Sequence, residues 1–80
     1  MKENQFLEFL TKLIQNTDEL KGRVSQSMKM QDRLKDDLGF DSMALMIILY
    51  ELQEHKPNLK ISELPKWKLV KDIYASVESL

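Results

Sequence analysis

The sequence is 80 residues long and contains no cysteine, and its 12 lysines and arginines nearly balance 13 aspartates and glutamates. This length predicts a single domain over residues 1–80, and the balanced charge argues against a strongly basic nucleic-acid-binding protein. The lack of cysteine excludes thiolate zinc sites and fits the reducing cytoplasm, where we expect the protein to act. The longest apolar run, Met43–Tyr50, is too short to span a bilayer, so no membrane partner is expected.

The first predicted element is an amphipathic helix over residues 4–15. When each residue is placed about 100° after the last, its apolar side chains fall within about 160° of arc. They are Phe6, Leu7, Phe9, Leu10, Leu13 and Ile14. Residues 17–31 show no regular period, and we expect a long loop there that Met28 and Met30 attach to the core.

The segment 42–55 predicts a helix with two apolar stripes. The first stripe contains Leu45, Ile48, Leu49 and Leu52. The second, almost opposite, contains Met43, Met46, Ile47 and Tyr50. A small helical domain needs only one stripe for its core. The second is therefore either covered by further helices, with the methionines filling gaps, or exposed as a docking surface for another protein.

A short third element is expected after the central helix. Residues 60–66 predict one turn of helix with Ser62 as its N-cap. Ile61 and Leu64 are the candidates for burial in this turn. Pro65 lies either in this short helix or in the first turn of the helix that follows, and the sequence leaves both placements open.

The last predicted element is an amphipathic helix over residues 69–80, whose apolar side chains fall within about 140° of arc. They are Leu69, Val70, Ile73, Tyr74, Val77 and Leu80. The polar side is assigned to Lys71, Asp72, Ser76 and Glu78. Trp67 is expected to be a partly buried anchor for this helix. No period-two alternation or hairpin turn pair is present, so the predicted class is all-α.

The charges are distributed unevenly along the chain. Residues 32–54 contain six acidic and two basic residues, whereas residues 56–72 contain five lysines and two acids. The two segments either form solvated faces that attract one another weakly or provide an acidic patch that steers a basic partner. The acidic central segment argues further against DNA binding, because a recognition helix carries Arg, Lys, Asn or Gln on its outer face.

The junction before the central helix, residues 36–43, carries the strongest functional signal. Gly39 permits a backbone turn that other residues resist. Asp41 and Ser42 stand at the predicted helix start, where either side chain can cap exposed backbone N–H groups. A phosphate ester on Ser42 would also be favoured there, because unpaired N–H donors and the positive end of the helix dipole attract an anion. From spacing alone, a plain cap is the more common use of such a pair.

Residues 37–43, which read Asp-Leu-Gly-Phe-Asp-Ser-Met, resemble the signature of acyl carrier and peptidyl carrier proteins, Asp-Leu-Gly, any residue, Asp-Ser-Leu. Only Met43 departs from that signature. The order and length of the predicted helices are also similar to the four-helix bundle of that family. The resemblance implies that Ser42 carries a 4′-phosphopantetheine arm from coenzyme A and that Asp41 helps a phosphopantetheinyl transferase to recognise the site. The protein would hold acyl groups as thioesters and would catalyse no reaction itself.

The resemblance also implies a partner surface. Its contact residues would be Met43, Met46, Ile47 and Tyr50 on the central helix, together with the acidic Asp36 and Asp37 before it. Besides the transferase, the expected partners are an acyltransferase, a ketosynthase or adenylating enzymes, and the carrier is expected to be a monomer. Fatty-acid carriers typically have acidic residues where this chain has Ala44 and Ile47. The difference favours a specialised polyketide or related pathway and an apolar partner groove over general fatty acid biosynthesis.

A second hypothesis is a small non-enzymatic adaptor that binds a partner through the outer face of the 42–55 helix, with Ser42 only a cap. An independent enzyme is not expected, because the sequence shows no metal-ligand cluster, no glycine-rich phosphate loop and no Ser/His/Asp arrangement. The only histidine, His55, stands at the end of the central helix, where a cation is favoured.

Overall fold

Four helical elements form the regular structure of residues 1–23 and 27–80, which are the residues that the computed structural model describes. They are α1 (Glu3–Gln15), α2 (Ser42–His55), the 3-10 helix η1 (Ile61–Lys66) and α3 (Val70–Glu78). Within these ranges the chain forms no strand, which confirms the predicted all-α class. No helix in this part of the chain combines the length and the apolar character needed to cross a membrane.

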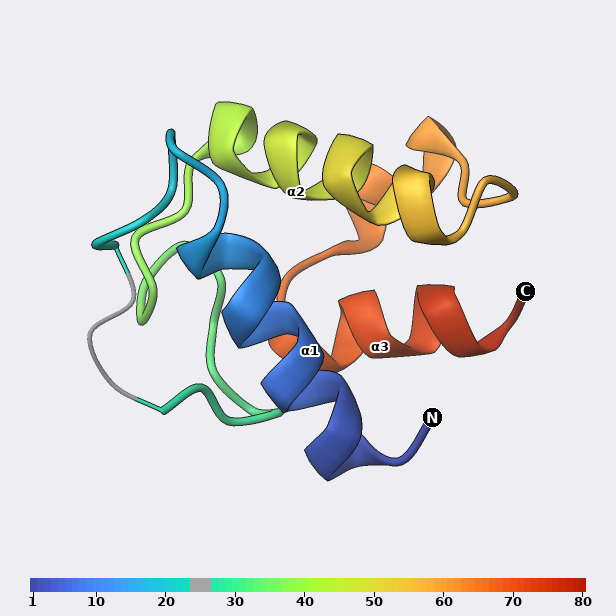
Figure 1. The fold of residues 1–80 in the computed structure, drawn as a ribbon, viewed down its shortest axis with the longest axis horizontal. Helices are drawn as coiled ribbons and strands as arrows, with labels where there is room; N and C mark the ends of the chain where they lie inside the picture. The colour runs from blue at the N-terminus through green and yellow to red at the C-terminus, as the bar shows by residue number, and fades with distance from the viewer. Residues whose placement is uncertain (24–26) are drawn as a thin grey trace.

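The three α-helices lie around a common core (Figure 1). In this view α2 lies along the top, α3 lies below it, and α1 runs obliquely past both, while the long connection from α1 to α2 occupies the opposite side from the chain ends. The ends themselves are tied together, because the Met1 amino group lies 3.1 Å from the Glu78 carboxylate. The Tyr74 hydroxyl also donates to the Met1 carbonyl at 2.6 Å. These contacts attach the N-terminal residue to α3.

The helix α1 begins one residue earlier than its apolar pattern predicts. The side-chain oxygen of Gln5 accepts the backbone N–H of Lys2 at 3.0 Å, which satisfies a group left unpaired at the helix start. The buried residues of α1 are Phe6, Leu10, Leu13 and Ile14. Leu7 and Phe9 are partly buried against the core, so the predicted apolar face is confirmed.

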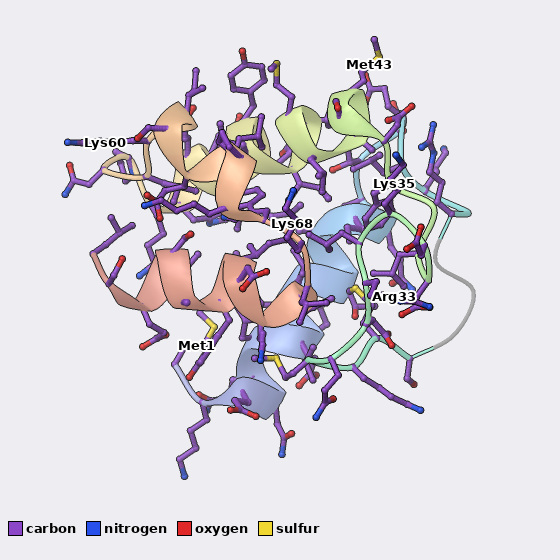
Figure 2. All side chains as sticks on the ribbon, turned by 180° about the vertical axis from the view of Figure 1, so that it is seen from behind. Met1, Arg33, Lys35, Met43, Lys60 and Lys68 are labelled. Carbon is purple, nitrogen blue, oxygen red and sulfur yellow. The ribbon has the colours of Figure 1, made fainter. Side chains whose placement is uncertain are left out.

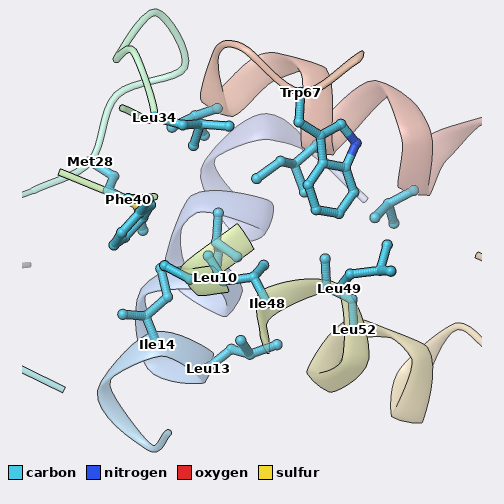
Figure 3. Close-up of a cluster of buried hydrophobic side chains, with 14 of the residues drawn as sticks. Leu10, Leu13, Ile14, Met28, Leu34, Phe40, Ile48, Leu49, Leu52 and Trp67 are labelled. Atoms are coloured by element: carbon cyan, nitrogen blue, oxygen red, sulfur yellow. The ribbon is translucent and has the colours of Figure 1, made fainter. Parts of the chain in front are cut away.

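The first stripe of α2 faces the core, as predicted. Ile48, Leu49 and Leu52 are fully buried, and Leu45 is partly buried. Figure 3 shows Ile48 near Leu10 and Leu13 of α1, and Leu49 below Trp67. Full burial of one such side chain contributes about 1.5–3 kcal/mol relative to leaving it exposed. This stripe therefore holds α2 in place and sets the position of the helix start.

Side chains from the long connection enter the same core. Met28 is buried and Met30 is partly buried, which confirms both predicted anchors. Leu20, which has no periodic pattern around it, is fully buried and was not anticipated from the sequence.

The last part of this connection pairs with the segment before α3. Two backbone hydrogen bonds, at 2.9 and 3.0 Å, join residues 32–34 to residues 68–70. They form an isolated antiparallel bridge between Arg33 and Leu69, which the sequence did not predict. Because of this bridge, the turn before α2 and the chain between η1 and α3 lie side by side next to the start of α2.

The short helix η1 differs from the sequence-based prediction in two respects, its N-cap and the burial of its apolar residues. Its N-cap is Lys60 and not Ser62, and no side chain caps it. The predicted burial of Ile61 is wrong, since this side chain is 52% exposed, whereas Leu64 is partly buried. A 3-10 helix of six residues presents only two turns to its neighbours. Here the second turn, with Leu64, contacts the core, and the first extends into solvent.

The helix α3 is shorter at both ends than the predicted range 69–80. Leu69 is its N-cap, and Leu80 lies beyond its last residue and is 54% exposed, so the expected place of Leu80 on the apolar face is wrong. Pro65 lies inside η1, which decides between the two placements left open. Tyr74 is partly buried, with its ring edge-on to Phe6 at a centroid distance of 5.1 Å. The buried apolar residues of α3 are Val70, Ile73 and Val77.

Candidate functional site

An ion pair between Arg33 and Asp37 holds the turn that leads into α2. Arg33 donates from Nε and Nη2 to the two carboxylate oxygens of Asp37 at 3.3 and 3.2 Å, and its backbone N–H donates to the same carboxylate at 2.8 Å. These hydrogen bonds lower the pKa of Asp37 and raise the pKa of Arg33. Gly39 follows with a φ of +72°, a conformation that glycine adopts without a steric penalty. The turn predicted at Gly39 is therefore confirmed.

The start of α2 separates the roles of Asp41 and Ser42. Asp41 is the N-cap, and its Oδ1 accepts the backbone N–H of Ala44 at 2.8 Å. Ser42 is the first residue of the helix and is exposed. Its hydroxyl forms no hydrogen bond with any part of the chain that the structure describes. Of the two residues that could cap the helix, Asp41 does so, and the Ser42 hydroxyl is left available for another group.

Ala44 explains why α2 has no second capping acid. It occupies the third helical position, where a capping box places Glu or Gln, and only 1% of it is exposed. The first turn of α2 contains no acidic residue. Among the described residues, Asp41 is the acid whose carboxylate accepts an N–H group at this positive helix end, which favours a further anion beside Ser42. Because Ala44 is buried, it adds no apolar area to a partner surface, contrary to what the sequence suggested.

A pocket of about 700 Å³ opens beside Ser42. Phe40 and Leu45 line it from the side of α2, and Leu64 and Trp67 line it from η1 and the residue that follows η1. The volume lies within the range of about 300–1,000 Å³ that is common for small-molecule sites. Ser42 thus stands where the start of a helix meets the mouth of a pocket with apolar walls.

A chain of hydrogen bonds fixes the η1 side of this pocket. The Trp67 indole N–H donates to the Ser76 hydroxyl at 2.9 Å, and Ser76 donates to the Glu63 carboxylate at 2.9 Å. Lys66 lies 3.0 Å from the other Glu63 oxygen, and the hydrogen bonds from Lys66 and Ser76 lower the pKa of Glu63. The predicted place of Ser76 on the polar side of the last helix is wrong, since Ser76 is 5% exposed and its hydroxyl accepts one hydrogen bond and donates another. Trp67 is 3% exposed, more deeply buried than expected for an anchor.

Sequence reasoning missed this pocket. Phe40 occupies the variable position of the motif, and Leu64 and Trp67 belong to a different element, so the walls are far apart in the sequence. Apolar residues that line a pocket do not differ in type from those that fill a core. The only usable signal was the concentration of apolar residues around η1, a helix too short to bury them itself.

The second stripe of α2 points into solvent over most of its length. Met43, Met46 and Tyr50 are 73, 37 and 51% exposed. Ile47 is partly buried against the core. The alternative in which further helices cover this stripe is therefore wrong for the first three side chains, and Figure 2 shows Met43 at the periphery of the molecule.

The two acidic residues of the predicted partner surface both lie beside Arg33. Asp36 is 3.6 Å and Asp37 is 3.2 Å from the guanidinium group, and all three residues are exposed. The turn before α2 therefore presents two carboxylates and one cation to solvent, and Arg33 offsets part of the acidic charge that a basic partner would meet.

The histidine and the acidic residues of the described ranges form no group of three or more that could hold a metal ion. His55 lies at the end of α2, exposed, with its ring edge-on to Phe9 at 5.2 Å between centroids. No catalytic or metal-binding role is assigned to it.

Comparisons with known proteins do not place the chain in a family. No family model matches it, and no curated protein and no solved structure gives a match. The site combines an exposed serine hydroxyl that forms no hydrogen bond with residues 1–23 or 27–80, a helix start and an adjacent pocket.

Proposed function

We propose that the protein is an acyl carrier protein in which Ser42 bears a 4′-phosphopantetheine arm and presents acyl groups as thioesters to biosynthetic enzymes. One observation carries the proposal: Asp41 caps α2, and the neighbouring Ser42 hydroxyl is exposed at the helix start with no hydrogen bond to the described residues. A phosphodiester on this oxygen would be an anion at the positive end of α2. The order of three α-helices and one short helix, with a long first connection, supports an acyl-carrier-like four-helix bundle.

Attachment of the arm would be a group transfer from coenzyme A to Ser42. A bond forms between Ser42 Oγ and the phosphorus that bears pantetheine, the bridging P–O bond of the coenzyme A diphosphate breaks, and 3′,5′-adenosine bisphosphate leaves. A base of the phosphopantetheinyl transferase takes the serine proton, since no described side chain of this protein is hydrogen-bonded to the Ser42 hydroxyl. The arm supplies the thiol that holds the acyl group, and this chain supplies the anchor and the contact surface.

The exposed residues around Ser42 would meet the partner enzymes. Asp41 would contribute to recognition by the transferase through the carboxylate oxygen that does not cap the helix. Met43, Met46 and Tyr50 would contact an acyltransferase, a ketosynthase or an adenylating enzyme, with Ile47 at the edge of the contact. Large apolar side chains at an interface favour a partner with an apolar groove, which supports a carrier of a specialised polyketide or related pathway.

Intact-mass spectrometry tests the attachment directly. After incubation with coenzyme A, magnesium and a broad-specificity transferase, the protein is expected to gain the mass of one phosphopantetheine. Ser42→Ala should abolish the gain, whereas Ser62→Ala, which alters another exposed serine near a helix start, should leave it unchanged. No gain on the wild-type protein, in a reaction that modifies a reference carrier completely, would refute the proposal.

The exposed apolar stripe supports a second candidate, an adaptor that binds a partner through the outer face of α2. Met43, Met46 and Tyr50 are exposed three and four residues apart on one face of α2, and a contiguous exposed apolar patch is typical of a protein-interaction site. If the mass assay stays negative, this candidate predicts that a native partner is lost on Met46→Glu and retained on Ser42→Ala. The carrier predicts that both changes impair function.

A further inference from the structure

The five methionines of the chain differ in their exposure to solvent. Met28 is buried in the core, and Met30 is packed against it. Met43 and Met46 are exposed on α2, outside the described core cluster. Met1 is also exposed, at the N-terminal residue that is attached to α3. A thioether in water is open to oxidants, whereas the packing around a buried one shields it.

The two exposed methionines of α2 lie beside Ser42. Met43 follows Ser42 directly and stands at the periphery of the molecule (Figure 2). Met46 is four residues after Ser42, so both side chains share one face of the helix, and Tyr50 continues this row one turn further on. An enzyme that reaches the Ser42 hydroxyl therefore meets both thioethers in the same contact.

Oxidation at these two positions would alter the surface of α2 and not the core. The chain has no cysteine, so without the arm its thioethers are the sulfur groups that a mild oxidant meets. A sulfoxide is polar, and its oxygen accepts hydrogen bonds. Burial of that oxygen in an apolar partner groove requires its desolvation, which opposes binding. Because Met43 and Met46 lie outside the described core, the fold should tolerate the same change.

We propose that Met43 and Met46 form a reversible oxidation site, at which a hydroperoxide weakens the contact between α2 and its partner enzymes. The inference rests on the proposed function, since the surface that changes is the one that the carrier would present to those enzymes. It adds a form of regulation to that surface.

The oxidation is an oxygen transfer to sulfur. The thioether sulfur attacks the terminal oxygen of the hydroperoxide, an S–O bond forms and the O–O bond breaks. The proton of the transferred oxygen moves to the departing oxygen, so the sulfur is oxidised while the peroxide is reduced to water or an alcohol. A thiol-dependent methionine sulfoxide reductase returns the thioether, with release of water and formation of a disulfide on the reductase.

Peptide mass mapping tests where the oxygen is added. After brief treatment of the arm-free protein with dilute hydrogen peroxide, Met43 and Met46 should each gain one oxygen before Met28 and Met30 do. Urea unfolding of the same sample should match that of the untreated protein. Equal rates at all four methionines, or a loss of stability while Met28 and Met30 are unmodified, would overturn the inference whether or not the protein is a carrier.

Transfer kinetics test the consequence for a partner. Once the peroxide has been removed, untreated and oxidised protein are compared as substrates of a phosphopantetheinyl transferase with coenzyme A and magnesium. Oxidation should lower kcat/KM about tenfold, mainly through a higher KM. Reductases for both sulfoxide epimers should restore the original value. An oxidised protein that the reductases repair but that stays a poor substrate would contradict the reversible site.

Two matched variants each remove two thioethers. Met43→Leu with Met46→Leu keeps apolar side chains on α2, and peroxide treatment should change its kcat/KM less than about twofold. Met28→Leu with Met30→Leu should respond to peroxide as the wild type does, and urea unfolding establishes that both variants fold. Equal responses of the two variants, or a wild-type kcat/KM that oxidation leaves unchanged, would overturn the inference alone. No transfer to the untreated protein would refute the proposed function and the inference with it.

Discussion

The starts of α2 and α3 satisfy their unpaired backbone N–H groups in different ways. In α3, the carboxylate of Asp72, inside the first turn, accepts the N–H groups of Lys68 and Leu69 at 2.9 and 2.8 Å. In α2, Asp41 precedes the helix and accepts the N–H of Ala44. The first N–H groups of α3 itself, those of Val70 and Lys71, are accepted by the carbonyls of Asp32 and Met30 at 3.0 and 2.9 Å. The start of α3 is therefore closed by Asp72 together with a neighbouring segment, whereas a cap before the helix leaves the start of α2 open beside Ser42.

Packing explains why the two helices differ. Asp72 and Ala44 both occupy the third position of their helices. Asp72 lies at the surface of the fold, so its carboxylate can reach back along the chain, but Ala44 is buried and has no room for a longer side chain. The same fold therefore keeps one helix start closed and leaves the other available for an anion.

Placing an acid at the third position of α2, as in α3, should have the largest effect on the free energy of unfolding. Ala44→Glu places a carboxylate in the core, and we expect a loss of more than about 3 kcal/mol in the free energy of unfolding, from overpacking and burial of charge. Urea unfolding measures this loss. Met43→Glu, one position away but 73% exposed, is the control and should stay within about 0.5 kcal/mol of the wild type. Similar losses in both variants would show that the third position is not restricted by packing.

Removing the acid of α3 should have the next largest effect. Asp72→Ala leaves two backbone N–H groups without their acceptor, and we expect a loss of about 1–2 kcal/mol in urea unfolding. Asp72→Asn keeps an acceptor oxygen and should lose less than the alanine variant. If the asparagine and alanine variants are equally unstable, the carboxylate acts through its charge and not through the two hydrogen bonds.

The two neighbouring residues at the start of α2 should then be separable by stability alone. Asp41→Ala removes the cap and should lower the free energy of unfolding by about 1 kcal/mol. Ser42→Ala removes a hydroxyl that has no hydrogen-bond partner among the described residues, and it should change the free energy of unfolding by less than about 0.5 kcal/mol. The expected order would be contradicted by a larger loss in Ser42→Ala, because the serine would then be part of the cap.

The smallest effect is expected from protonation of Asp37 before α2. Its pKa is lowered from the ordinary value of 3.8 by the hydrogen bonds from Arg33, so the folded state binds its proton less readily than the unfolded state. The stabilisation that ionised Asp37 gives to the folded state is present above about pH 4 and is lost as the pH falls through 3.8 toward the lowered pKa. The difference between the urea midpoints measured at about pH 6 and at about pH 3 should therefore be smaller for Asp37→Asn than for the wild type. Asp18→Asn, an exposed acid in the connection after α1, is the control, and an equal change there would contradict the role of the Arg33–Asp37 pair.

The sequence by itself determined where the helices lie and which stripe of α2 enters the core. The apolar period of residues 4–15 and 42–55 reproduces α1 and α2 to within one residue at each end. Periodicity works here because a helix brings residues three and four apart onto one face, whatever surrounds that face. The motif also located the turn at Gly39 and placed Asp41 and Ser42 at the start of α2.

Only the tertiary structure decided what surrounds each face. It determined that Asp41, and not Ser42, caps α2, that Ala44 is buried, and that Ser76 lies inside a hydrogen-bonded chain with Trp67. It also brought η1 against the start of α2 to form the pocket. These outcomes depend on contacts between segments far apart in the sequence. A local repeat of apolar residues contains no information about which of those segments will become neighbours.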